Sequence, residues 1–316
     1  GPRVGADAAV LDLGDRVLVA KADPVTFATE LIGWYAVQVN ANDVACLGAR
    51  PRWFLATLLL PEGAAVSLAQ EIFGQILSAC DSLGITLVGG HSEVTAQLKR
   101  PIVAGAMLGE VEKERVVWPS GARPGDALLL TKGIALEGTS ILAREMEGEL
   151  LKRGASSALL ARARDLLFTP GISVVSDALE ASRAARVHAM HDPTEGGLAT
   201  GLLEMAQGAG VGLEVDASAI QVLPECQAIC RLLELDPLGL LASGALILAV
   251  AQEEVTTVID ALAQKGISTR GLGHVTDAVN GLRLRSLDGV KELPRFHRDE
   301  LARLFGEGET SRVVEG

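Results

Sequence analysis

The chain alternates short apolar β-like runs with amphipathic helical stretches, and few folds accommodate such an order of elements. The pattern predicts helices over residues 31–47 and 66–83. The second has Ile72, Phe73, Ile76, Leu77 and Cys80 on one apolar stripe, which we expect to be core. The strands predicted for this half span residues 8–13, 17–22, 53–60, 85–88 and 102–108. This order is typical of α/β layers and disfavours helical bundles and all-β sandwiches.

A turn-forming segment, WPSGARPG at residues 118–125, separates the first set of elements from a second. The later strands are predicted over residues 127–131, 187–190, 213–215 and 246–250, and the later helices over residues 140–153, 157–167 and 198–207. Because a single core stops growing near about 250–300 residues, a chain of 316 residues has room for two. We predict two mixed α/β domains, residues 1–120 and 121–316.

Composition and charge exclude several classes of protein. Hydrophobic residues make up 48% of the chain, yet charges, glycines and prolines interrupt every run before it could span a membrane. A net charge of −12 disfavours nucleic-acid binding, which depends on clustered Lys and Arg. The four cysteines form no CxxC pair, and no leader-like segment precedes the first strand. We therefore expect a soluble cytoplasmic protein that binds neither nucleic acid nor membrane.

Acidic residues fall at the ends of apolar runs, where α/β sheets place their ligands. Asp7 lies just before the first strand. Asp23 and Asp192 each follow an apolar run and precede a proline, so we expect each to finish a strand. Asp43 and Asn40 are one helical turn apart and therefore share a helix face.

Two interpretations of these acids are open on this pattern alone. Magnesium bound to a nucleotide uses carboxylates, phosphate oxygens and water, and Asp7, Asp23, Asp43 and Asp192 offer the carboxylates. Alternatively, they are turn and capping aspartates, as most Asp-Pro and Gly-x-Asp sequences are.

A further candidate is the segment Gly89 to Glu93, GGHSE, which follows the predicted strand at 85–88. Its backbone N–H groups, with little side chain in the way, would suit a phosphate. No Walker A or GxGxxG sequence supports a P-loop or a Rossmann site. Zinc ligands are a further alternative, with either His188 and His191 or the helical pair Cys226 and Cys230.

Several segments, taken in order, resemble the superfamily of aminoimidazole ribotide synthetase (PurM) and the hydrogenase maturation protein HypE. They are GADAAVLDLGD, ADPVTF, IGWYAVQVNANDVACLGARP, LVGGHSEVT and MHDPTEGGLATGLLEMAQGAGVGLEVD. The resemblance spans both predicted domains. It implies PurM-like N- and C-terminal domains, a homodimer formed through the N-terminal sheets, and ATP with Mg²⁺ between the two domains.

The resemblance also implies roles for individual residues. The metal-binding acids are Asp7, Asp23, Asp43 and Asp192, and the nucleotide-binding residues are Asn40, Asn42, Gly89, Gly90, Thr194 and Gly196. The catalytic candidates are Asp43, His91, Asp192 and Glu195. His91 is the candidate general base, since a neutral imidazole accepts a proton near pH 7.

Among the branches, DPVTF, NDVACLGARP and HDPTEGGLAT are most similar to HypE, which dehydrates a protein-bound thiocarboxamide with ATP. HypE ends in a tail with a reactive cysteine, whereas this sequence ends SRVVEG and its last cysteine is Cys230. We therefore expect a related branch and not HypE itself. Thiamine-monophosphate kinase-like or selenophosphate synthetase-like activity is the alternative within the superfamily.

The resemblance implies an ATP-dependent enzyme that phosphorylates or dehydrates a small or protein-bound carbonyl or amide acceptor. A maturation protein is a possible partner. A second class is a non-catalytic nucleotide-binding assembly factor, which would bind ATP without turning it over. A third is a zinc hydrolase built on His188 and His191.

Overall fold

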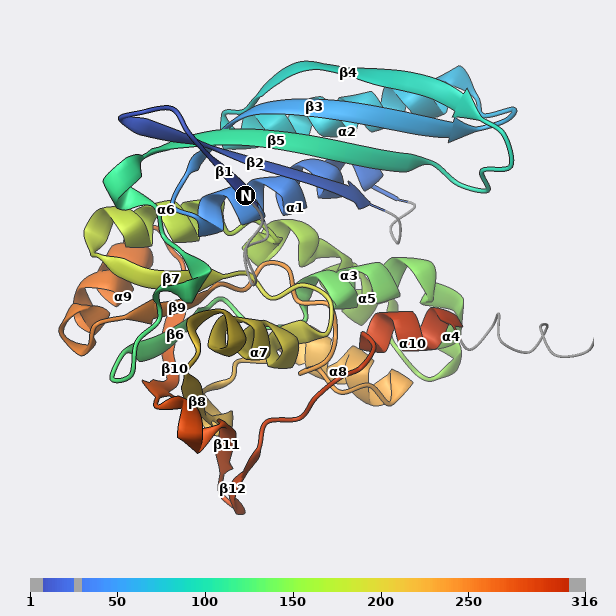
Figure 1. Ribbon diagram of the computed structural model, residues 1–316. Coiled ribbons are helices and arrows are strands. Elements are labelled where there is room, and N and C mark those ends of the chain that lie inside the picture. The colour runs from blue at the N-terminus through green and yellow to red at the C-terminus, as the bar shows by residue number, and fades with distance from the viewer. Residues whose placement is uncertain (1–7, 26–29, 307–316) are drawn as a thin grey trace, which may run out of the picture. The chain divides into compact units, whose positions relative to one another are not determined.

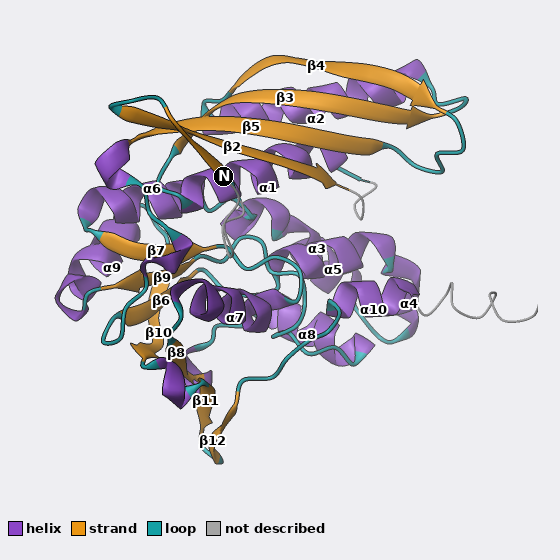
Figure 2. Ribbon diagram, viewed as in Figure 1, coloured by secondary structure: helices purple, strands orange, loops and turns teal. Residues whose placement is uncertain are grey.

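The computed structural model describes residues 8–25 and 30–306, and the chain forms two compact units. The first comprises Gly1–Trp118 and Ser173–Leu179, and the second comprises Pro119–Ile172 and Glu180–Gly316. Helices and strands are mixed in both units (Figures 1 and 2), which confirms the predicted α/β class. The sequence gives no sign that residues 173–179 return to the first unit.

The sheet of the first unit has the order β1-β2-β5-β3-β4, with β3 and β4 parallel and the other neighbours antiparallel. Its strands are β1 (Ala9–Asp12), β2 (Arg16–Val25), β3 (Arg50–Pro61), β4 (Thr86–Thr95) and β5 (Ile102–Glu112). Phe54 and Leu58 of β3 are buried, whereas Trp53 and Leu55 are 36% and 37% exposed. Because strand side chains alternate, these two residues lie on the opposite, open face.

Two helices, α1 (Ile32–Cys46) and α2 (Val66–Leu83), cover the buried face of this sheet (Figure 1), and both were predicted from their apolar spacing. A side chain at Gly33 would clash with the Ile72 carbonyl, 2.5 Å from the position of its Cβ, so glycine allows α1 to approach α2 closely. α1 is consequently buried almost all round. Its polar residues are therefore placed inside the unit.

The sheet of the second unit has the order β12-β11-β8-β10-β6-β9-β7. Its strands are β6 (Ala127–Thr131), β7 (Val187–His191), β8 (Gly212–Asp216), β9 (Ile247–Val250), β10 (Thr269–Thr276), β11 (Leu282–Ser286) and β12 (Gly289–Glu292). The first four match predicted strands. The last three were missed, because glycines and charged residues interrupt their apolar alternation.

In the second unit, two short helices take the place of one predicted helix. The helices of this unit are α3 (Leu136–Glu145), α4 (Glu147–Lys152), α5 (Ser157–Asp165), α7 (Gly197–Ala209), α8 (Pro224–Leu233), α9 (Val255–Ala263) and α10 (Glu300–Gly306), while α6 (Val175–Ala184) is divided between the units. The single helix predicted over residues 140–153 is wrong, because Met146 leaves the helical conformation between α3 and α4. α3, α5 and α8 pack against one another.

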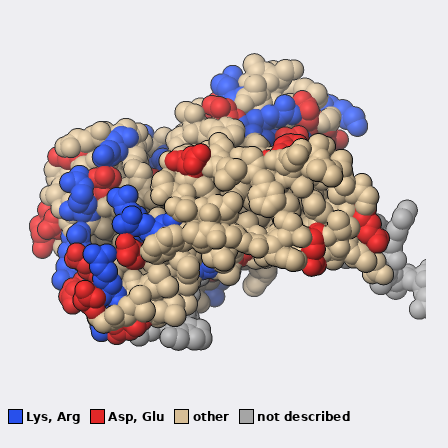
Figure 3. Space-filling model, turned by 90° about the horizontal axis from the view of Figure 1, so that it is seen from above, with Lys and Arg blue, Asp and Glu red and all other residues tan. Residues whose placement is uncertain are grey.

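Within residues 8–25 and 30–306, no helix combines the length and apolar character needed to span a bilayer. On the face of the molecule shown in Figure 3, basic and acidic side chains are interspersed, and the basic ones do not gather alone. A phosphate backbone would find little to attract it on this face.

Candidate functional site

Helix α1 carries four almost fully buried polar side chains, Gln38, Asn40, Asn42 and Asp43. Buried polar groups cost free energy unless they are hydrogen-bonded. The Asn40 amide nitrogen donates to the Asp23 carbonyl oxygen at 3.2 Å, and the Asn42 amide oxygen accepts from the Val174 backbone nitrogen at 2.8 Å. The first bond ties α1 to β2. The second gives a physical reason why residues 173–179 belong to the first unit.

The Lys21 ammonium lies between two of the predicted acids. Its Nζ is 2.8 Å from Asp43 Oδ2 and 3.5 Å from Asp23 Oδ2. The Lys21 and Asp43 side chains are only 16% and 7% exposed, so solvent screens this ion pair little. The structure thus places a positive charge between the half-exposed Asp23 carboxylate of β2 and the buried Asp43 carboxylate of α1.

Sequence reasoning named Asp23 and Asp43 but missed Lys21. The available signal was the period of two along β2, which puts Lys21 and Asp23 on one face of the strand. Asp23 does not finish its strand as expected, because β2 continues through Pro24 to Val25. Within residues 8–25 and 30–306, β1 pairs with Val17 to Ala20 and does not extend to Pro24.

The segment Gly89 to Glu93 is part of β4 and does not follow it, so the expected strand end at Val88 is wrong. Gly90 is needed for strand packing, since a Cβ there would lie 1.9 Å from the Ala56 carbonyl oxygen, whereas a Cβ on Gly89 would meet open space. β4 is an edge strand of the described sheet. His91 is well exposed there, with its Nε2 3.3 Å from Glu93 Oε2. Nucleotide contact by Gly89 and Gly90 stays a prediction.

In the second unit, Asp192 directly follows β7 as predicted, and it is almost fully buried. The turn that follows leads into α7. Gly196 occupies the capping position with φ of 76°, in the left-handed region that favours glycine, and its N–H donates to Asp299 Oδ2 at 2.7 Å. The Thr194 carbonyl accepts from the Gly197 N–H at 3.1 Å. The Gly196 N–H of this turn is therefore already bonded to Asp299, a residue of the same unit.

Glu137, near the start of α3, was not predicted as a site residue. Its side chain is buried, and burial raises its pKa to about 7. The negative charges of Glu195, Asp299 and Asp192 raise the pKa further, and Ser243 opposes the shift. Glu137 lies inside a helix and away from any strand end or turn motif, so the sequence gives no local signal for it. It extends the acidic site of the second unit beyond Asp192 and Glu195.

Within residues 8–25 and 30–306, no three His, Cys, Asp or Glu side chains are grouped so that they could hold a metal ion. The residues proposed as zinc ligands are therefore not part of such a group. His188 Nδ1 lies 2.9 Å from both carboxylate oxygens of Asp126, and His191 Nε2 lies 2.9 Å from Glu204 Oε2. Burial raises the pKa of the Cys226 and Cys230 thiols to about 11 and about 12, which keeps them protonated. Asp7 lies outside the described residues.

The chain is thus built of two mixed α/β units, each with a buried carboxylate, Asp43 in the first and Asp192 in the second. The family model described as AIR synthase related protein, N-terminal domain, matches residues 5–111, and the corresponding C-terminal domain matches residues 123–283. The chain belongs to the AIR synthase related protein family.

Relatives and solved structures agree with this assignment. The chain is 31% identical over 275 residues to the carbamoyl dehydratase HypE of Cupriavidus necator, covering 84% of this chain and 74% of the relative. It is 29% identical over 321 residues to HypE of Escherichia coli, covering 94% and 89%. The crystal structure of E. coli HypE has a TM-score of 0.78 at 26% identity, covering 93% of this chain and 92% of that one.

A thiamine monophosphate kinase structure from Aquifex aeolicus shares the fold, with a TM-score of 0.70 at 20% identity over 88% of this chain and 90% of that one. The resemblance to the PurM and HypE superfamily is therefore confirmed, as is the expected class of ATP-dependent enzyme at the level of the family.

Proposed function

We propose that the chain is a magnesium-dependent enzyme that uses ATP to phosphorylate or dehydrate a carbonyl or amide group of an acceptor. The position of the Lys21 ammonium between the partly exposed Asp23 carboxylate and the buried Asp43 carboxylate carries the proposal, because magnesium bound to a nucleotide uses one or two carboxylates together with phosphate oxygens. Relatives named carbamoyl dehydratase support it, as does a HypE structure described as a complex with ATP, with a TM-score of 0.73.

The residues present fit a magnesium ion. Hard divalent cations prefer carboxylate oxygens, and the Lys21 ammonium stands in for such a charge between Asp23 and Asp43. Asp23 and Asp43 would hold the ion, with Asp7 and Asp192 as further proposed ligands. Bound there, the ion would offset the negative charge of the triphosphate and of the transferred phosphoryl group.

The chain's own residues would bind and orient the reactants. The side-chain amides of Asn40 and Asn42 hold α1 in place through their hydrogen bonds. We propose that this helix contacts the nucleotide together with the Gly89 and Gly90 backbone. Lys21, already held beside carboxylates, would turn its ammonium toward phosphate oxygens.

On the acceptor side, we propose that Asp192 and Glu195 orient the acceptor, with Thr194 and Gly196 shaping the turn that presents them. His91 is the proposed proton acceptor. Its imidazole is exposed, and its Nε2 lies 3.3 Å from Glu93 Oε2.

Nucleotide binding is the first test. We expect a non-hydrolysable ATP analogue with Mg²⁺ to raise the melting temperature by several degrees, because a ligand at 100 times its Kd stabilises the folded state by about 2.7 kcal/mol. The analogue without Mg²⁺ is expected to give a much smaller shift. The measurement is differential scanning fluorimetry, with GTP analogue and Mg²⁺ alone as controls. Equal shifts with and without Mg²⁺ would contradict the proposed metal dependence.

The same preparation separates the enzyme from a nucleotide-binding assembly factor. An enzyme releases ADP or AMP from ATP and Mg²⁺, whereas an assembly factor retains ATP without turnover. A maturation protein is the proposed partner, as in the solved structure described as a HypE–HypF complex, which shares the fold. We also propose a cytoplasmic location, since the four cysteines, all within the described residues, form no disulfide, as is usual in a reducing compartment.

We propose a homodimer formed through the open sheet face of the first unit. Trp53 and Leu55 present apolar surface there, and isolated sheets rarely leave such a face in water. Trp53→Asp is expected to weaken self-association by about 100-fold, since a central aromatic residue carries a large part of an interface's binding energy. Analytical ultracentrifugation measures this change.

The matched control is Leu77→Asp on α2. The apolar stripe predicted Leu77 to be core, but that prediction is wrong, because Leu77 is 49% exposed at the edge of the stripe. This variant is expected to remain a dimer. A monomeric wild type at micromolar concentration, or equal dissociation of both variants, would contradict the proposed face.

A further inference from the structure

The Asp299 carboxylate joins three segments of the second unit that are distant in sequence. Its Oδ2 accepts from the Gly196 N–H at 2.7 Å, and its Oδ1 accepts from the Leu301 N–H at 2.7 Å. Burial raises the pKa of Asp299, while bonds from the N–H groups of Gly196, Leu301 and Leu241 oppose this rise. The carboxylate therefore holds the turn after β7, the loop before β9 and the start of α10 at one point.

The turn from Thr194 to Gly197, here called the acceptor turn, is flexible by composition. Gly196 and Gly197 have φ of 76° and 64°, and glycine loses more conformational freedom on folding than any other residue. The Thr194 carbonyl accepts from the Gly197 N–H at 3.1 Å and from the Ala242 N–H at 3.3 Å. These bonds hold the two ends of the turn, whereas the bond to Asp299 holds Gly196 between them.

The residues proposed to orient the acceptor lie on this turn and just before it. Asp192 precedes the turn and is buried, while Glu195 adjoins Gly196 and is exposed. The negative charge of Glu195 also raises the pKa of Asp299, so the two carboxylates lie near enough to repel each other. A fixed Asp299 therefore limits the directions that the Glu195 side chain can take.

The segment that carries Asp299 is itself firmly packed. Leu301 is buried, and a Cβ on Gly239 would lie 2.3 Å from a carbon of the Phe296 ring, so the loop at Gly239 contacts this segment closely. The segment also lies beyond residues 123–283, which match the C-terminal domain of the family. A part of the chain outside the matched domain thus supplies an anchor for the acceptor turn.

We infer that Asp299 is a positioning residue for the acceptor: its carboxylate holds Gly196 and thereby sets the orientation of Asp192 and Glu195. Its effect on catalysis rests on the proposed function, which assigns Asp192 and Glu195 to the acceptor. That Asp299 fixes the turn does not depend on this assignment.

Asp299→Ser separates this role from the capping of α10. A serine hydroxyl can still accept from the Leu301 N–H at the start of the helix, but it is too short to bond Gly196 as well. In the whole chain, we expect the Gly196 amide hydrogen to exchange at least about 10-fold faster in this variant, because the turn loses a bond to a charged group. The amides of α10 are expected to keep their wild-type exchange rates. NMR measures both sets of rates.

Turnover gives the second measurement on the same variant. The kcat for ADP release from ATP and Mg²⁺ is expected to fall by at least about 10-fold, since small misplacements of orienting groups cost that much or more. The KM for ATP is expected to stay within about two-fold, because Asp299 acts on the acceptor turn and not on the proposed nucleotide contacts of α1.

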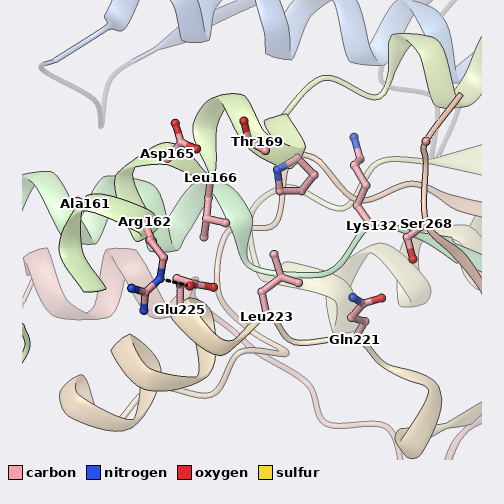
Figure 4. A pocket seen from close by; sticks show the side chains of 12 residues that line it. Lys132, Ala161, Arg162, Asp165, Leu166, Thr169, Gln221, Leu223, Glu225 and Ser268 are labelled. Carbon is pink, nitrogen blue, oxygen red and sulfur yellow. Dashed lines mark hydrogen bonds and ion pairs between the residues drawn. The ribbon is translucent and has the colours of Figure 1, made fainter. Parts of the chain in front are cut away.

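Two variants serve as controls. Glu300→Gln removes the negative charge next to Asp299 but keeps an oxygen that can accept from the Asp236 N–H. Glu225→Gln removes the ion pair with Arg162, in which Nε and Oε1 are 2.7 Å apart, at the wall of a cavity whose lining includes neither Asp299 nor the acceptor turn (Figure 4). Both variants are expected to keep the wild-type exchange rate at Gly196 and the wild-type kcat.

Unchanged exchange at Gly196 in Asp299→Ser would overturn the inference. Equally faster exchange in all helices of the second unit would also overturn it, because that result indicates a general loss of stability. Faster exchange at Gly196 together with wild-type kcat and KM would refute the positioning role. If the wild type released no ADP, the proposed function would fail, and the exchange rates alone would decide whether Asp299 holds the turn.

Discussion

We expect Asp43→Asn to lower ATP turnover by about 100-fold or more, since removing one preorganised charge-stabilising group commonly costs 10²–10³ in rate. The substitution keeps the shape of the side chain but removes the negative charge that the Lys21 ammonium contacts at 2.8 Å. The measurement is steady-state ADP release with saturating ATP and Mg²⁺. Asp81→Asn, at an exposed position on α2, is the matched control and is expected to keep full turnover.

A loss of fold must be separated from a loss of chemistry. Breaking a buried ion pair usually costs about 3–5 kcal/mol, but here Asp23 remains 3.5 Å from Lys21, so we expect a smaller loss for Asp43→Asn. Adding Lys21→Met removes the excess charge and should recover stability without recovering turnover. Recovery of turnover in the double variant, or full turnover in Asp43→Asn, would contradict the role given to Asp43.

The second large effect concerns Glu137, whose burial raises its pKa from 4.5 to about 7. The folded state therefore binds a proton that the unfolded state releases, and stability falls as pH rises from about 4.5 to about 7. Glu137→Gln removes this dependence. Relative to the wild type, the variant is expected to gain up to about 3 kcal/mol at pH 8, by the conversion of about 1.4 kcal/mol per pKa unit, and to gain little at pH 4.5.

Urea denaturation at several pH values measures this difference, and groups common to both proteins cancel in the comparison. Glu253→Gln, at an exposed position, is the control and should show no such trend. A variant that loses stability equally at pH 4.5 and pH 8 would show that Glu137 is stabilised as a charged group, against the burial argument.

Much of the fold could be predicted because the regular spacing of apolar residues indicates which face of each helix or strand is buried. α2 was predicted with its observed bounds, and α1 to within a residue at each end, since their buried positions recur at helical spacing. β10 and β12 were not predicted. Their side chains are largely exposed or small, so they depend on pairing with neighbouring strands, which local patterns do not encode.

Sequence reasoning singled out the polar residues that lie at a strand end or on a helix face, and it missed the polar residues that lie elsewhere. Asp23, Asn40 and Asp43 come together in the structure, as their positions indicated. Asp299 reaches Gly196 across about a hundred residues of sequence, and no local motif could reveal that contact. The segment at Gly89 and Gly90 shows the opposite error, since a glycine that close strand packing requires, Gly90, makes part of β4 resemble a loop.

The bond between Asn42 and Val174 has a practical consequence for dividing the protein. A fragment ending at residue 120 would resemble a complete N-terminal domain, yet it would lack the backbone donor that this amide uses in the intact chain. We therefore expect each half to be less stable when it is expressed alone. Co-expression, or an insertion point chosen away from residues 173–179, offers the better route to studying either half.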